Sequence, residues 1–184
     1  TPCQSSAASD VYKRQVYKVL RRTCRQHTKR KTIQYEKETM SNRFHLAVEA
    51  GDLKTAVDFY VNVLGCTKHN SEFKYPDAWV DINFWGNELT LHGSDPAKKK
   101  QGERHNVDMG NVTVPHFGVH ISAEDFANLK ERLAEHKIKY IDEPYVRFEG
   151  TELEQETMFI ADPYGNAMEI KTMKNPDMLW KINK

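Results

Sequence analysis

The stretch ADPYGNAMEIK, residues 161–171, places an acidic residue inside a segment that otherwise has the pattern of a buried strand. Its DP and GN pairs are turn formers, so we expect the chain to reverse before a strand that starts at about Ala167. Alternation along that strand puts Met168 and Ile170 on one face and Glu169 on the other. Glu169 is therefore either an ordinary solvent-facing acid or a ligand turned into an enclosed site.

The residues before this stretch complete one structural unit. Residues 116–121 alternate between apolar and polar side chains, which is typical of a half-buried strand. A helix follows with its apolar side chains on one stripe: Phe126, Leu129 and Leu133. Two more strands, at about 139–148 and 157–161, precede the closing strand. Residues 115–174 are therefore predicted to form a β-α-β-β-β module.

The first half of the chain repeats this order over residues 40–96. A strand at 43–49 is followed by a helix whose apolar stripe is Leu53, Ala56, Val57, Tyr60, Val61 and Leu64. A weaker strand at 67–73 and two alternating strands, 79–85 and 88–92, complete the module. We interpret residues 97–114, which are rich in charge and glycine, as a linker. The sequence thus predicts an α+β fold of two duplicated modules, each with a helix covering the apolar face of its sheet.

Composition excludes several classes of function. The 184 residues carry a net charge of only +1, which argues against nucleic acid and acidic membranes as partners. No apolar run is long enough to cross a bilayer. The cysteines, Cys3, Cys24 and Cys66, have no zinc-like spacing and are interpreted as reduced thiols of a cytoplasmic protein. A small molecule is the partner that these features favour.

Residues 1–39 differ in composition from the rest. Between Val11 and Thr32 there are nine Lys or Arg and no acid. We interpret this basic tail as disordered and non-native, a translated adaptor ahead of a native start at Met40. An organelle transit peptide is the second interpretation, and a nucleic-acid-binding arm is the third. Residues 175–184 are expected to form a C-terminal tail.

The polar faces of the predicted strands collect a set of side chains able to bind a metal. The set comprises His45, Asp81, Asn83, Glu88, Thr90, His92, His116, His120 and Glu169. A sheet with one face in water also alternates in this way, but it does not predict histidine at the head of both module-opening strands. Two histidines and one carboxylate suit Fe(II), Mn, Zn or Ni, with coordination positions left open for a substrate.

Several short motifs carry a family resemblance. They are FHLAV at 44–48, DFY at 58–60 with VLG at 63–65, PHFGV at 115–119, and DPYGN at 162–166 with MEI at 168–170. Over residues 43–173 the chain resembles the vicinal oxygen chelate superfamily, which includes glyoxalase I, fosfomycin and bleomycin resistance proteins, and extradiol dioxygenases. WVDIN at 79–83 and EPYVRF at 143–148 most resemble a group of predicted dioxygenases of the extradiol type.

The resemblance implies that the modules form an open, cup-shaped mixed sheet, with helices on its outer face and a divalent metal inside. The implied ligands are His45, His116 and Glu169, with Fe(II) favoured over Mn, Zn or Ni. His92 is a fourth ligand or a residue that faces the substrate. The candidates for supporting or catalytic roles are His120, Tyr145 and Arg147. Of these, Tyr145 and Arg147 are expected in a loop that covers the cup, where the arginine could pair with an anionic substrate.

The implied function is a metal-dependent enzyme that binds a small substrate through two adjacent oxygens, most simply an extradiol-type dioxygenase. Extradiol enzymes usually carry two pairs of modules, however, and this chain has one pair. With Zn or Ni the same site would favour a glyoxalase-like isomerase or lyase. A drug-binding protein without catalysis is the alternative from another class. Whether the modules complete one cup within the chain or exchange across a homodimer stays open.

Overall fold

The computed structural model describes residues 42–69, 79–99, 101–107 and 110–181. Its contacts divide the chain into two units, Thr1–Ser41 and Asn42–Lys184. The predicted tail at 1–39, with Cys3 and Cys24, lies outside the described residues and stays a prediction. The fold below is that of the second unit.

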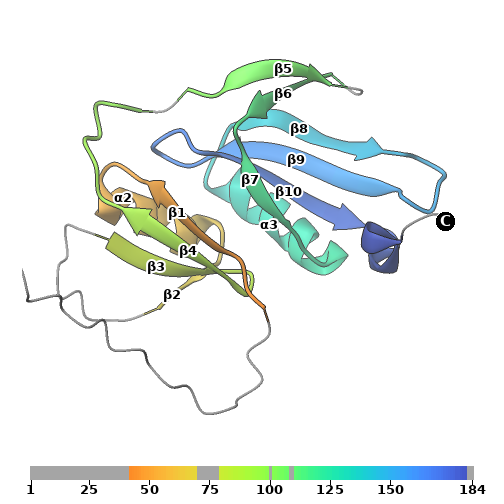
Figure 1. Ribbon diagram of the computed structural model, residues 1–184, viewed down its shortest axis with the longest axis horizontal. Coiled ribbons are helices and arrows are strands. Elements are labelled where there is room, and N and C mark those ends of the chain that lie inside the picture. The colour runs from red at the N-terminus through yellow and green to blue at the C-terminus, as the bar shows by residue number, and fades with distance from the viewer. Residues whose placement is uncertain (1–41, 70–78, 100, 108–109, 182–184) are drawn as a thin grey trace, which may run out of the picture. The chain divides into compact units, whose positions relative to one another are not determined.

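The first module forms a four-stranded sheet covered by one helical segment (Figure 1). Its elements are β1 (His45–Glu49), α2 (Leu53–Asp58), the π-helical turn η1 (Phe59–Val63), β2 (Thr67–His69), β3 (Trp79–Phe84) and β4 (Asn87–His92). The strand order is β1-β4-β3-β2, with β1 parallel to β4 and the other pairs antiparallel. Asp52 begins α2 by accepting a hydrogen bond from the Thr55 amide, 2.9 Å, which satisfies one free N–H of the first turn. Residues 70–73 of the weaker predicted strand lie outside the described residues.

The second module repeats the same topology. Its elements are β7 (Phe117–His120), α3 (Ala123–Glu135), β8 (Tyr140–Arg147), β9 (Gln155–Ala161) and β10 (Ala167–Met173). The strand order β7-β10-β9-β8 matches that of the first module, and the parallel pair is again the first strand with the last. Ser122 begins α3 by accepting from the Asp125 amide, 3.0 Å. The predicted α+β fold of two β-α-β-β-β modules is confirmed; the described strands of the modules form two mixed four-stranded sheets and no closed barrel.

Two elements were not predicted. A hairpin of β5 (Glu103–Val107) and β6 (Gly110–Val114) lies within the stretch that the sequence analysis interpreted as a linker. A 3-10 helix, η2 (Pro176–Trp180), lies in the predicted C-terminal tail. The hairpin is easy to miss because its first strand, ERHNV, lacks a clear apolar face.

One hydrophobic core joins the two modules. It contains Ala56, Tyr60 and Leu64 of the first helical segment, Phe126, Leu129 and Leu133 of α3, and the inward side chains of both sheets, such as Leu91 and Ile170. Arg132 of α3 donates from Nε and Nη2 to the carbonyls of Val63 and Leu64, at 3.1 and 3.0 Å, at the end of η1. Among the described helices, none is long and apolar enough to span a membrane.

The turn before β10 is held by the buried carboxylate of Asp162. Its Oδ1 accepts from the amides of Tyr164 and Asn166, both at 2.9 Å, and its Oδ2 accepts from the Asn166 side chain at 2.7 Å. The hydroxyl of Tyr60, from the first module, donates to the same Oδ2 at 3.1 Å. A buried charge needs such partners to offset its lost hydration. This turn therefore both starts β10 and ties the modules together.

Candidate metal site

Glu169 projects from β10 on the face away from the core, yet only 8% of its surface is exposed. Its Oε1 accepts a hydrogen bond from the Thr157 hydroxyl at 3.0 Å. Its Oε2 lies 2.8 Å from the Lys171 ammonium. Alternation along β10 places Lys171 on the same face as Glu169, and antiparallel pairing with β9 brings Thr157 opposite Lys171. The carboxylate is thus buried and held from two sides.

His116 precedes β7 and points its ring at this carboxylate. Its Nε2 lies 3.3 Å from Oε2 of Glu169. Its Nδ1 lies 2.6 Å from the carbonyl oxygen of Thr113. The ring packs edge-on against Phe159, with centroids 5.2 Å apart. A carbonyl oxygen can only accept, so Nδ1 carries the hydrogen in this contact.

That tautomer makes the site suitable for a cation. When Nδ1 donates to Thr113, a neutral ring has a lone pair on Nε2, and this lone pair faces the lone pairs of Glu169 Oε2. Two acceptors at 3.3 Å repel each other; the Lys171 ammonium, 2.8 Å from Oε2, offsets part of this repulsion, and a proton or a metal ion between the two acceptors would remove it. A histidine whose second nitrogen donates to a carbonyl is also the usual state of a metal-bound imidazole. The donor set, one imidazole nitrogen and one carboxylate oxygen, therefore fits a divalent transition metal.

His45 does not join this pair in the single chain. It lies on β1, where its Nδ1 is 3.1 Å from Oε2 of Glu88 on the neighbouring strand β4, and 57% of its side chain is exposed. Among the described residues, no three His, Cys, Asp or Glu side chains are grouped closely enough to hold an ion. The structure thus brings together two of the three predicted ligands, and the complete triad stays a prediction.

The remaining predicted residues lie around both sheets. His92 ends β4 and is exposed. His120 is the register partner of Lys171, and its pKa is lowered mainly by burial and further by the Lys171 ammonium. Tyr145 and Arg147 lie within strand β8, not in the covering loop that was expected. The Arg147 guanidinium lies 5.0 Å from the centroid of the Phe148 ring. The roles of these four residues stay predictions.

Four residues of the site were missed by the sequence analysis. They are Thr113, Thr157, Phe159 and Lys171. Lys171 had a signal, because alternation places it on the same face as Glu169. Thr157 and Phe159 become neighbours of Glu169 and His116 only through the register of β9 with β10. Thr113 acts through its backbone carbonyl, for which the sequence holds no signal.

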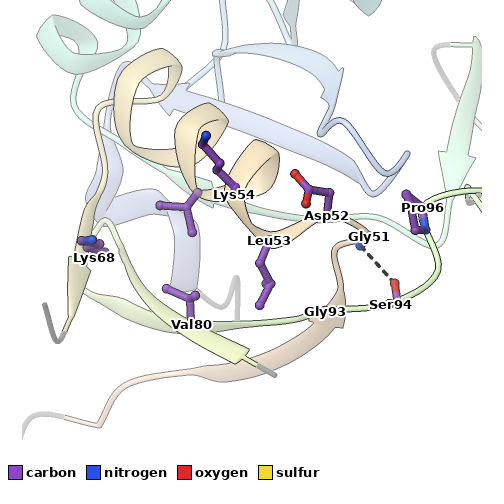
Figure 2. A pocket seen from close by; sticks show the side chains of 10 residues that line it. Gly51, Asp52, Leu53, Lys54, Lys68, Val80, Gly93, Ser94 and Pro96 are labelled. Carbon is purple, nitrogen blue, oxygen red and sulfur yellow. Dashed lines mark hydrogen bonds between the residues drawn. The ribbon is translucent and has the colours of Figure 1, made fainter. Parts of the chain in front are cut away.

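Two cavities are relevant to the choice of site. One, of about 550 Å³, lies at the N-terminal end of α2 (Figure 2). Two of its polar side chains already have partners: Asp52 accepts from the Thr55 amide at 2.9 Å, and Ser94 accepts from the Gly51 amide at 3.0 Å. The other, of about 350 Å³, includes His116 in its wall, together with Leu46, Val48, Gln101, Gly102, Pro115, Phe117, Gly165, Asn166 and Ala167. We regard the second as the relevant cavity because His116 lies in its wall.

Comparisons with known proteins agree with this fold. The sequence profile of the Glyoxalase/Bleomycin resistance protein/Dioxygenase superfamily matches residues 43–170. The chain is similar to a glyoxalase/bleomycin resistance protein/dioxygenase from Alicyclobacillus acidocaldarius, at 34% identity and a TM-score of 0.58, over 76% of this chain and 96% of that one. It is also similar in fold to the fosfomycin resistance protein FosX from Listeria monocytogenes, at 14% identity and a TM-score of 0.52, over 72% and 93% of the two chains. No curated protein matches the sequence.

Proposed function

Because the chain belongs to the glyoxalase/bleomycin resistance protein/dioxygenase superfamily, we propose that it is a metal-dependent enzyme acting on a small substrate with two adjacent oxygens. Members of this superfamily bind small molecules, and most are metal-dependent enzymes. The observation that carries the proposal is the 3.3 Å approach of His116 Nε2 to Glu169 Oε2, with Nδ1 tied to the Thr113 carbonyl. The reaction that we favour is ring cleavage of the extradiol type, with Fe(II) as the ion.

Each residue of the site has a definite task in this proposal. His116 and Glu169 would hold the ion, which would supply Lewis acidity to two neighbouring substrate oxygens. Thr157 orients the carboxylate through Oε1, Lys171 balances the charge on Oε2 in the metal-free protein, and Phe159 limits rotation of the imidazole and excludes water on one side. The adjoining cavity of about 350 Å³ is within the size range of small-molecule sites.

The third ligand, His45, would come from a second copy of the chain. β1 and β7 are each the outer strand of their sheet, and no described strand pairs with their outer edges. An edge of this kind is a ready template for another chain. A two-fold dimer could therefore place His45 of one copy beside His116 and Glu169 of the other, and it would do so twice by symmetry. We propose this homodimer as the state that completes the metal site.

Metal binding is the first test. The protein, stripped with a chelator, is titrated with Fe(II), Mn(II), Zn(II) and Ni(II) by calorimetry, and His116→Gln and Glu169→Gln are compared with a matched surface variant, Glu135→Gln. We expect one ion per chain in the wild type and in Glu135→Gln, and at least about tenfold weaker binding in both site variants. Equal binding by all four proteins would contradict the proposed site.

The shared site is tested by mixing two inactive variants. His45→Ala and Glu169→Ala are each expected to lose metal binding alone. In a heterodimer of the two, one site is doubly damaged and the other is intact, so random exchange should restore on the order of a quarter of the sites. No recovery, with exchange verified by mass spectrometry, would mean that the site is not shared between copies.

The reaction is decided by assays on the loaded protein. Oxygen consumption with a panel of catechols should be observed with Fe(II) and abolished in Glu169→Gln. No consumption with iron loaded would exclude ring cleavage. Under that outcome, isomerase or lyase activity with Zn or Ni is assayed on the same preparation. Tight binding of a ligand by protein that holds no metal would instead support the drug-binding alternative.

A further inference from the structure

We propose that the β5–β6 hairpin positions His116, and that Arg104 is the residue through which it does so. The inference takes its catalytic meaning from the proposed metal site, but it concerns a different part of the chain. It rests on a continuous series of contacts that runs from β8, through the hairpin, to the imidazole.

The series begins at a bidentate ion pair. Arg104 of β5 donates from Nη2 to Oδ1 of Asp142 at 2.7 Å and from Nη1 to Oδ2 at 3.0 Å. Asp142 lies in β8, at a point where the register between β8 and β9 shifts. We call this bidentate ion pair of Arg104 and Asp142 the fork. It fixes the orientation of the two side chains as well as their distance, because two parallel N–H groups donate to the two oxygens of one carboxylate. The hairpin is thereby attached to the second sheet by a side chain, since none of its described residues pairs with a strand of that sheet.

The series continues across the hairpin. Arg104 and Thr113 are register partners of β5 and β6, and Nη1 of Arg104 also lies 3.4 Å from the Thr113 hydroxyl. Thr113 is buried, although most described residues of the hairpin are exposed. The guanidinium thus contacts both Asp142 of the sheet and the side chain of the residue whose carbonyl binds His116.

The series ends at the ring. The Thr113 carbonyl receives the Nδ1 hydrogen of His116 at 2.6 Å, three residues along the chain. This contact decides which nitrogen faces Glu169. If the hairpin moved away from β8, the carbonyl would move with it, and the ring could turn or exchange its tautomer. Partners of metal-binding histidines typically change metal affinity 10- to 100-fold when removed.

The strand register places the two ends of this series in the same part of the second sheet. Asp142 is the β8 partner of Phe159, and Phe159 is both the β9 partner of Glu169 and the ring that packs against His116. Asp142, which binds Arg104, therefore lies in the same row of cross-strand partners as Glu169. Anchoring the hairpin at Asp142 places the imidazole relative to Glu169.

The test uses Arg104→Met and Asp142→Asn, which remove the fork with little change in size. The matched control is Lys130→Met, which removes another ion pair of the second module: Lys130 Nζ lies 2.9 Å from Glu156, and this pair makes no contact with His116. The first readout is the pair of imidazole ¹⁵N shifts of His116 in metal-free protein, assigned with His116→Gln, under conditions in which the wild-type ring is neutral. The second is the Kd for Mn(II), measured beside the thermal unfolding curve.

We expect the wild-type ring to be in the Nδ1–H form, and both fork variants to shift towards a mixture of tautomers. Their Kd for Mn(II) should rise about tenfold or more, while Lys130→Met leaves both readouts unchanged. Arg104→Lys, which keeps the charge but not the fork, should recover only part of the loss. Unchanged nitrogen shifts in Arg104→Met and Asp142→Asn would overturn the inference. If the wild type binds no metal, the proposed function fails while the nitrogen shifts still decide this inference.

Discussion

Gly118 lies where β7 and β10 approach each other most closely, and replacing it with alanine should damage both the fold and the metal site. It is the register partner of Glu169 in the parallel pair. A methyl group at this position would overlap the carbonyl oxygen of Glu169 and lie 2.7 Å from its carbonyl carbon and 3.1 Å from its nitrogen. All three atoms belong to the backbone, so no side-chain rotation can relieve the overlap.

The cost follows from these distances. The carbonyl carbon alone would require a movement of 3.4 − 2.7 = 0.7 Å to reach ordinary contact, and the overlap with the carbonyl oxygen is deeper, so the strands must separate by more than this. Overpacking of this kind typically costs about 1–3 kcal/mol, and each strand hydrogen bond that stretches out of range adds about 1 kcal/mol. We therefore expect Gly118→Ala to lose about 3 kcal/mol of unfolding free energy, which corresponds to a fall in Tm of about 10 °C for a unit of this size.

The assay is thermal unfolding by circular dichroism, with a Mn(II) titration of the same samples. Gly86→Ala is the control for the added methyl group, because no atom outside the neighbouring residues lies within 4 Å of it; unlike Gly118, Gly86 has a positive φ of +88°. It should cost only about 1–2 kcal/mol of backbone strain and leave metal binding unchanged. Gly118→Ala should in addition weaken Mn(II) binding, because His116 directly precedes β7 and Glu169 lies on β10, the two strands that separate. A Tm of Gly118→Ala equal to that of wild type would refute the steric argument.

Four further predictions concern three side chains. Tyr60→Phe should lose about 1.5–3 kcal/mol in denaturant unfolding, because it removes a buried hydrogen bond to the Asp162 carboxylate; a loss below about 0.5 kcal/mol would contradict this. Burial raises the pKa of Tyr60 well above its usual value of about 10. The folded protein therefore holds this proton more tightly than the unfolded chain does, and the stability that this contributes is lost as the pH rises above about 10. Unfolding titrations should show wild-type stability falling more steeply in this range than that of Tyr60→Phe. Burial likewise raises the pKa of the Cys66 thiol to about 12, so a thiol reagent at neutral pH should modify this cysteine only after unfolding, as mass spectrometry of a Cys66-containing peptide would show. Lys171→Met should bind Mn(II) several-fold more tightly than wild type. The Lys171 ammonium lies 2.8 Å from the Glu169 oxygen that an ion would use, and it repels a second cation there. Weaker binding by Lys171→Met would show that Lys171 instead orients the ligand.

The sequence analysis placed Glu169 and His45 on strands that the structure contains, and His116 at the start of a strand that begins one residue later, but it could not show which of the three meet. Alternation along β10 is enough to place Glu169 and Lys171 on one face, because a strand has a period of two. The same reasoning places His45 on β1 and His116 just before β7. Distances between residues far apart in the chain depend on strand register and module packing, which no local pattern encodes. This is why the Phe159 and Thr157 contacts were missed.

What the sequence by itself determined is the pair of modules, their helices and the family to which they belong, since these follow from periodicity, turn residues and short motifs. Only the tertiary structure decided that His116 and Glu169 meet while His45 pairs with Glu88, and that a supposed linker is a hairpin anchored by Arg104. The physical reason is that local pattern depends on neighbours along the chain, whereas the site depends on side chains and carbonyls brought together by sheet register and by ion pairs between elements.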